Sequence, residues 1–223
     1  HDEIDINTIY IDGTKLEANA NKFTFVWKKA TLKYQARLMK KMSNALLDLN
    51  EFYKECNIDI VYLVKEKYDV SDFIDTFENL QRIKRNVDTV FVKGIGHRKD
   101  EFQKKYEQFE EMTNKAMQYA ERIEKCGNRN SYSKTDEDAT FMHGKEDYYM
   151  KTGIFKAYYN IQIGVSDEYI RYIDVFQNSA VTPTFKPFLE GFNTMYHYYP
   201  KYPVADAGYG SFENYKYCQE HGM

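Results

Sequence analysis

A stretch without proline, from about Ala30 to Cys126, most limits what this chain can fold into. Its residues are mainly Lys, Glu, Gln, Leu, Met and Tyr, which helices favour or tolerate. Apolar residues recur near helical spacing from Leu32 to Leu49 and again over residues 99–125. Between them, Asp69-Val70-Ser71-Asp72 has the pattern of a capped helix start. The stretch predicts an arm of three antiparallel helices without a sustained heptad.

Strand patterns lie on both sides of this arm. Residues 4–12 alternate apolar and polar side chains, and residues 22–27 predict a second short strand. After a polar loop, two alternating runs flank a tight turn and predict a hairpin. The two hairpin strands are residues 158–166 and 169–176. A further strand is predicted at residues 202–205, with one helix before it at 183–199 and another after it from Ser211. We therefore expect an α/β fold, a mixed sheet with flanking helices.

Two aspartates each follow a strand-like run. Asp12 closes Thr8–Asp12 and precedes Gly13, and Asp206 closes Pro203–Asp206 and precedes Ala207-Gly208. In open α/β sheets, ligands and catalytic groups gather at the carboxyl ends of strands. If the two strands are neighbours, the carboxylates converge and can hold a divalent metal. The alternative is that each aspartate only caps a turn, since Asp-Gly and Asp-Ala-Gly are common turn sequences.

Composition limits the classes of protein that fit. The net charge of −3 does not favour a nucleic-acid binder by global charge. Cys56, Cys126 and Cys218 lie far apart, which argues against a zinc knuckle or a disulfide framework and suits a reducing cytoplasm. No run approaches the roughly 20 apolar residues of a membrane span. We expect a cytoplasmic protein without membrane contact.

Local charge differs from the global balance. No acidic residue occurs from Ala18 to Leu47, and the basic residues there predict contacts to DNA phosphates. A solvated helix face is the alternative. Trp27 and Tyr34 have the character to stack on bases, although we expect Trp27 in the core. The predicted DNA-contacting residues are Lys22, Lys28, Lys29, Lys33, Arg37, Lys40, Lys41, Lys134 and Lys145.

Several sequence blocks, in this order along the chain, resemble the DDE transposases of a bacterial insertion-sequence family. The resemblance covers about residues 8 to 217. Its blocks are Asp12–Lys22 with Phe25–Lys29, Ser133–Met142, Lys145–Asp147, Tyr159–Gln162 and Val204–Gly210. Each block alone is weak, and their common order makes the match specific.

The resemblance implies a ribonuclease H-like core that is interrupted by an all-helical insertion. Residues 1–28 are then the first part of the core, residues 29–127 the insertion and residues 128–223 the remainder. It also implies that Asp12 and Asp206 are two catalytic acids that bind Mg²⁺ or Mn²⁺. The family's third acid, a glutamate, lies on a later helix, so we expect this chain to be truncated before the final strand and helix of the core.

The implied function is that of a transposase catalytic domain, which cleaves DNA and transfers strands in a metal-dependent reaction. Its partners are the transposon ends, the target DNA and further copies of itself in a homo-oligomer, in the nucleoid of a bacterial cytoplasm. One alternative is a catalytically inactive fragment that binds DNA or another protein. A second is a stand-alone nuclease, which needs a third acid from Asp136, Asp138, Glu146 or Glu213.

Overall fold

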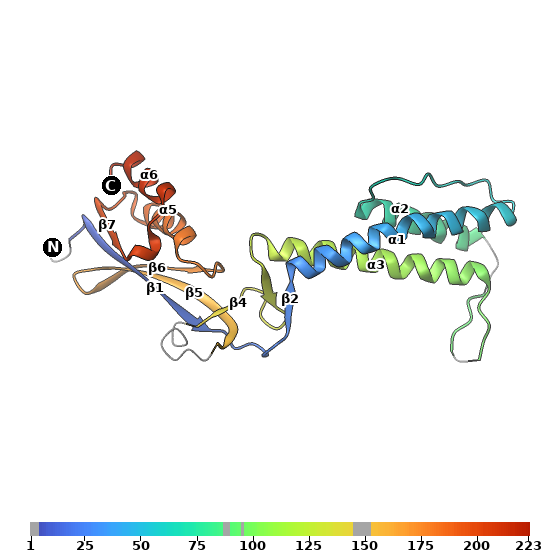
Figure 1. The fold of residues 1–223 in the computed structure, drawn as a ribbon, viewed down its shortest axis with the longest axis horizontal. Helices are drawn as coiled ribbons and strands as arrows, with labels where there is room; N and C mark the ends of the chain where they lie inside the picture. Colours follow the sequence, from blue (N-terminus) through green and yellow to red (C-terminus); the bar gives the residue numbers. More distant parts are fainter. Residues whose placement is uncertain (1–4, 87–89, 95, 145–152) are drawn as a thin grey trace. The chain divides into compact units, whose positions relative to one another are not determined.

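The computed structural model describes residues 5–86, 90–94, 96–144 and 153–223. The chain divides into two compact units. Residues 1–27 and 128–223 form one unit, built around a sheet, and residues 28–127 form a helical unit (Figure 1). The sheet unit is therefore discontinuous in sequence.

The helical unit contains α1 (Lys28–Glu55), α2 (Val70–Asn86) and α3 (Glu101–Cys126). One apolar face of each helix meets in a common core, as the helical spacing predicts. Among the core side chains with no exposed surface are Met42, Leu49, Phe73, Leu80 and Phe109. The three predicted helices are thus confirmed.

Their predicted antiparallel order is wrong for one pair. Asp48 of α1 pairs with Lys105 near the start of α3, and the Thr113 hydroxyl of α3 donates to the Phe73 carbonyl at the start of α2. Both α1 and α2 are therefore antiparallel to α3 and run in the same direction (Figure 1). The reason is the connection between them, which returns along α1: the Asn50 amide donates to the Tyr62 carbonyl at 2.8 Å.

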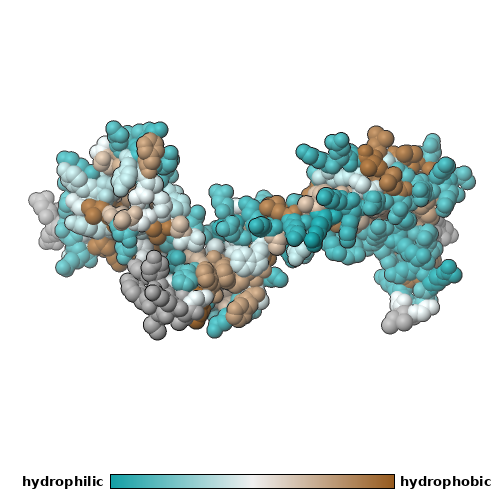
Figure 2. Space-filling model, viewed as in Figure 1, coloured by the Kyte–Doolittle hydropathy of each residue, from teal (hydrophilic) through white to brown (hydrophobic). Residues whose placement is uncertain are grey.

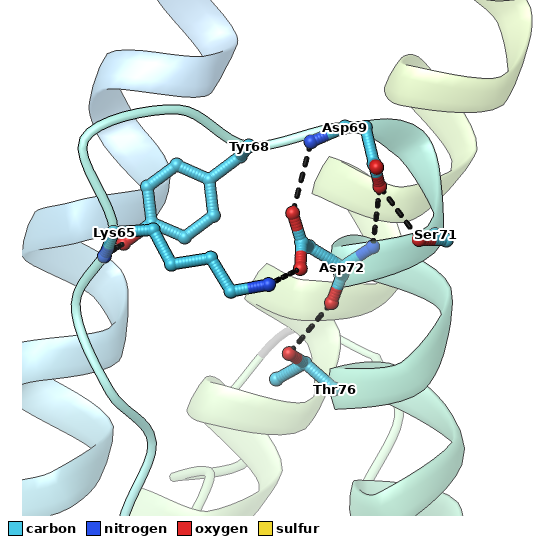
Figure 3. Close-up of polar contacts among 6 residues, drawn as sticks. All are labelled: Lys65, Tyr68, Asp69, Ser71, Asp72 and Thr76. Carbon is cyan, nitrogen blue, oxygen red and sulfur yellow. Dashed lines mark hydrogen bonds and ion pairs between the residues drawn. The ribbon is translucent and has the colours of Figure 1, made fainter.

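The predicted capped start of α2 is confirmed (Figure 3). The Asp72 backbone N–H donates to the Asp69 carboxylate at 3.2 Å, and the Asp69 N–H donates to the Asp72 carboxylate at 2.9 Å. This exchange is a capping box, with Asp in place of the usual Glu. The Ser71 hydroxyl also donates to Asp69 at 2.6 Å, and Lys65 pairs with Asp72 at 2.5 Å. The four groups hold the first turn of α2.

The sheet unit contains a mixed five-stranded sheet, which confirms the predicted α/β class. Strand β1 (Thr8–Glu17) is antiparallel to β5 (Phe155–Ser166) and parallel to β7 (Tyr202–Ala205). Strands β4 (Thr140–His143) and β6 (Tyr169–Phe176) both pair antiparallel with β5, over different stretches of it. The β1 strand therefore lies between β5 and β7.

The predicted hairpin is β5 and β6. Its turn residues, Asp167 and Glu168, have φ angles of 47° and 69°. Positive φ at both central positions is the signature of a type I′ turn, whose twist matches that of the paired strands. The hairpin prediction is confirmed.

One face of the sheet is covered by α5 (Phe185–Tyr196) and α6 (Phe212–Glu220). Ile9 and Ile11 of β1 are buried there against Phe188 of α5 and its apolar neighbours. The short 3-10 helices η1 (Thr182–Thr184) and η2 (Ala207–Tyr209) precede α5 and α6. The opposite face of the sheet carries exposed apolar side chains, among them Tyr10, Ile173, Val175 and Val204.

Two strand predictions need correction. The first strand does not end at Asp12 but continues to Glu17, because β5 pairs with it along its whole second half. The loop expected after the arm contains β3 (Ser131–Ser133), which pairs with β2 (Phe25–Trp27) in a separate small sheet.

The expectation that Trp27 lies in the core is wrong. Its side chain is 43% exposed, and its ring lies edge-on to Phe141 at 4.8 Å between centroids.

Figure 2 shows mainly hydrophilic residues on the visible face of the helical unit, with a hydrophobic patch at its upper edge. The connection between α1 and α2 exposes Val61, Leu63 and Val64. None of the helices in the described ranges has the length and apolar character needed to cross a bilayer.

Candidate functional site

The two aspartates are brought side by side by the parallel pairing of β1 and β7. The register places Ile11 opposite Ala205, so Asp12 and Asp206 are the next residues on the two neighbouring strands. Both are exposed, and both line the same pocket of about 280 Å³. Although β1 continues past Asp12, the β7 strand ends here, and its end leaves the carboxylates accessible.

Each carboxylate also accepts a local backbone hydrogen bond. The Gly13 N–H donates to Asp12 Oδ1 at 2.7 Å, and the Gly208 N–H donates to Asp206 Oδ1 at 2.8 Å. The turn-capping role therefore exists at Asp206, where the side chain caps η2. Each carboxylate has two oxygens with about four acceptor positions, so these bonds leave room for a cation.

Lys15 and His143 line the same pocket as the two aspartates. The Lys15 ammonium donates to the His143 carbonyl at 3.0 Å, and burial lowers the pKa of Lys15. The His143 ring packs against Phe155 at 4.8 Å between centroids. A cation and an imidazole thus lie beside the aspartate pair.

A buried tyrosine lies behind the pair. The Tyr209 side chain is 3% exposed, and its hydroxyl donates to Gln162 Oε1. Burial is the main reason for its raised pKa, and the negative charges of Asp12 and Asp206 raise it further. The Tyr209 phenol is therefore neutral and close to both carboxylates.

No third ligand joins the aspartates within the part of the chain that the structure describes. Over those residues, no group of three His, Cys, Asp or Glu is placed to hold a metal. Asp136 instead accepts the Tyr159 hydroxyl at 2.5 Å, and Asp138 accepts the Gln177 amide at 3.0 Å. Glu213 lies in the first turn of α6. Asp136, Asp138 and Glu213 therefore do not complete the site, and Glu146 lies outside the described residues.

The predicted DNA-contacting residues fall in both units. Lys22 and Lys134 belong to the sheet unit, where the Lys134 N–H donates to the Thr24 carbonyl at 2.9 Å. Lys145 lies outside the described residues. The others are on α1: Lys28, Lys29, Lys33, Arg37, Lys40 and Lys41.

Four of the α1 residues form one basic row. Lys29, Lys33, Arg37 and Lys40 are exposed and follow one another at spacings of three or four residues, which places them on one helix face. None of the four forms an ion pair with a residue that the structure describes. The two remaining cations differ. Lys28 donates to the Gly127 carbonyl at 2.5 Å. The pKa of the Glu111 carboxyl is lowered mainly by its hydrogen bond and ion pair with Lys115, and Lys41 adds a smaller effect.

The fold and the paired aspartates define an α/β domain with two carboxylates on neighbouring parallel strands. Residues 129–223 match the family model of the transposase DDE domain. The match confirms the predicted resemblance to DDE transposases for this part of the chain, which includes Asp206. Asp12 and the helical unit lie outside the matched range. No curated protein and no solved structure matches the chain.

Gln162 and Asn160 were not recognised as site residues from the sequence. Both are polar residues of β5 and are almost fully buried, at 0% and 1% exposure. Their neighbours Ile161 and Ile163 are only partly buried. An alternating strand normally turns its apolar side inward. Alternation alone predicts that the two polar side chains face solvent. Only their place in the Tyr159–Gln162 block, which resembles the family, could have indicated a role at the site.

Proposed function

We propose that this chain is the catalytic domain of a DNA transposase, with a ribonuclease H-like core, and that Asp12 and Asp206 bind Mg²⁺ or Mn²⁺. The observation that carries the proposal is the β1–β7 register, which makes the two aspartates neighbours. The match of residues 129–223 to the transposase DDE domain supports it independently. A DNA phosphodiester is the substrate that this family implies.

The donor set fits the metal. Mg²⁺ prefers oxygen ligands and is commonly held by one or two carboxylates together with waters and substrate phosphate. Two neighbouring carboxylates repel each other unless a cation lies between them. When bound, the metal supplies Lewis-acid stabilisation of a phosphate oxygen and an activated water or hydroxyl. Asp12 and Asp206 hold and orient it, and Lys15 and His143 line the same pocket.

The strand order supports the ribonuclease H-like core. The resemblance implies a first catalytic acid on the first strand and a second acid after the fourth. If the short β4 is set aside, the strands of this sheet are β1, β5, β6 and β7 in chain order, so β7 is the fourth. Asp12 is on the first of these strands. Asp206 directly follows β7. The helical unit between Trp27 and Asn128 then corresponds to the insertion.

DNA nicking tests the proposal. The wild-type chain is expected to nick supercoiled DNA in the presence of Mg²⁺ or Mn²⁺, and Asp206→Asn to lose this activity. The asparagine keeps an oxygen for the Gly208 N–H, so the cap of η2 survives the loss of charge. Asp174→Asn is a matched control, because Asp174 also accepts its neighbour's N–H, at 2.8 Å, but does not line the pocket. Equal nicking by wild type and Asp206→Asn would contradict the mechanism.

The second candidate function is DNA binding without cleavage. The observation that favours it is the lack of a third carboxylate beside Asp12 and Asp206 among the described residues. The basic row of α1 then remains as the functional surface. Salt-sensitive DNA binding by a chain that nicks no DNA with either metal is the result expected for this alternative.

A further inference from the structure

A closed ring of hydrogen bonds lies beneath the aspartate pair, on the helix-covered side of the sheet. It begins at Tyr209, whose hydroxyl donates to Gln162 Oε1. The Gln162 amide donates to Asn160 Oδ1 at 2.8 Å, and the Asn160 amide donates to the carbonyls of Asn178 at 2.8 Å and Ala180 at 3.3 Å. In this series of hydrogen bonds each side chain donates to the next, and the final acceptors are main-chain carbonyls.

The ring closes through the segment before α5. The Thr182 hydroxyl donates to the Gly208 carbonyl at 2.8 Å, within the turn that follows Asp206. The Asn214 amide donates to the carbonyls of Thr182 at 2.9 Å and Tyr209 at 2.7 Å. The ring therefore joins β5, the Ala180–Thr182 segment and the turn that carries Asp206.

The ring also passes directly behind Asp12. Gln162 is the β5 partner of Gly13, the residue after Asp12. A Cβ atom at Gly13 would lie 2.6 Å from Gln162 Nε2 and 3.0 Å from the Tyr209 hydroxyl. The hydrogen bond between Tyr209 and Gln162 thus passes over the backbone of β1 at Gly13, the one residue of this strand without a side chain. It connects the turn after Asp206 to the strand that fixes Asp12.

This polar ring is costly unless it is complete. The side chains of Gln162 and Asn160 are cut off from water, and an unpaired polar group in such a place is destabilising. Apolar residues would fill the same space without that penalty. A buried network with all its members paired restricts the positions that its parts adopt. Its location points to the geometry of the two carboxylates as the quantity that it restricts.

We propose that Tyr209, Gln162 and Asn160 are positioning residues that set the separation and orientation of Asp12 and Asp206 for a divalent metal. The proposal rests on the proposed function, because it assumes that the aspartates bind a metal. We assign Tyr209 a positioning role through Gln162 and the turn, because its phenol is buried and its hydroxyl is held by Gln162. Loss of partners behind metal ligands typically weakens metal binding by about 10–100-fold.

Mn²⁺ affinity, measured by calorimetry without DNA, tests this role. Tyr209→Phe and Gln162→Met remove the bond with little change in volume, and both are expected to bind Mn²⁺ roughly 10–100-fold more weakly than wild type. Tyr217→Phe is the matched control. Tyr217 is 6% exposed and its hydroxyl pairs with that of Tyr199 at 3.0 Å, away from the aspartates. This control is expected to keep wild-type affinity.

The outcomes separate the two proposals. If Asp206→Asn loses Mn²⁺ binding while Tyr209→Phe and Gln162→Met retain it, the positioning role is wrong and the proposed function stands. If wild type itself binds no Mn²⁺, both are wrong. Thermal unfolding identifies a variant that does not fold, and the other variant then decides the question. An equal loss of affinity in Tyr217→Phe would also overturn the positioning role, because the effect would not be specific to the ring.

Discussion

Gly13 is the position at which the site requires a residue without a side chain. It follows Asp12 on β1, and the contact between Tyr209 and Gln162 occupies the space that a Cβ would need. Both neighbours are held in a buried hydrogen-bonded ring, so neither moves freely. A methyl group at this position must therefore displace a buried polar side chain.

Gly13→Ala is expected to lower the free energy of unfolding by about 1–3 kcal/mol, the usual cost of overpacking a filled site. Chemical denaturation of both proteins measures this difference. In a Gln162→Ala background the same substitution is expected to cost less, because the nearest atom is gone. An equal cost in the two backgrounds would contradict the steric explanation.

At this scale, the sequence was a good guide to Asp12 and Asp206 and a poor one to their support. An apolar run followed by Asp and a small residue is a local pattern, and its meaning survives folding. The burial of Asn160 and Gln162 is not local. It depends on α5 and η2 covering the polar side of β5, which alternation along the strand cannot reveal.

At the scale of single elements, the start of α2 depends on reciprocal caps. Asp69→Ala removes one of them and is expected to lower the Tm by a few degrees, as the loss of other helix N-caps does. Asp75→Ala, an exposed position later in α2, is the control and is expected to change stability by less than about 0.5 kcal/mol. A cost for Asp69→Ala no larger than that of the control would refute the capping role.

The cap at Asp69 also has a defined pH dependence. The hydrogen bond from Ser71, followed by that from the Asp72 N–H, lowers the pKa of the Asp69 carboxyl below its ordinary value of 3.8. A lowered pKa in the folded state means that the contribution is present above the unfolded pKa and is lost as the pH falls through the folded pKa. The difference in Tm between wild type and Asp69→Ala is therefore expected to shrink in acid. A difference that is independent of pH would contradict this assignment.

The basic row of α1 predicts a change in the salt dependence of DNA binding. Lys33→Ala with Arg37→Ala is expected to weaken binding and to reduce the slope of log K against log salt by about 0.9 for each lost phosphate contact. Lys104→Ala with Lys115→Ala is the matched pair on α3, where both lysines are in ion pairs with neighbouring glutamates. If both pairs change the slope equally, α1 holds no particular DNA-binding face.

The elements themselves were largely predictable, and their connections were less so. Helix and strand periodicity depends on neighbours along the chain, so α1, α3, β5 and β6 followed from sequence. The end of β1 and the direction of α2 did not. The β1 strand is extended by β5, more than 100 residues later in the sequence, and α2 is reversed by a connection that folds back along α1.

At the scale of the whole molecule, the chain consists of two units with separate cores. Among the residues that the structure describes, the helical core contains none from the sheet unit. We propose that the helical unit is an insertion into the transposase core and folds by itself. A fragment of residues 28–127 is therefore expected to have a helical circular dichroism spectrum and to unfold cooperatively. A fragment without stable helix would show that this unit requires the rest of the chain.

The central claim is that Asp12 and Asp206 act as one metal site, and a double-mutant cycle on Mn²⁺ affinity tests it most directly. Asp12→Asn and Asp206→Asn are each expected to weaken binding strongly, and the double variant to bind little more weakly than either single one. Such non-additivity is expected of residues that share one ligand. Asp174→Asn is expected to bind like wild type. Additive losses, or unchanged affinity in either single variant, would contradict the claim.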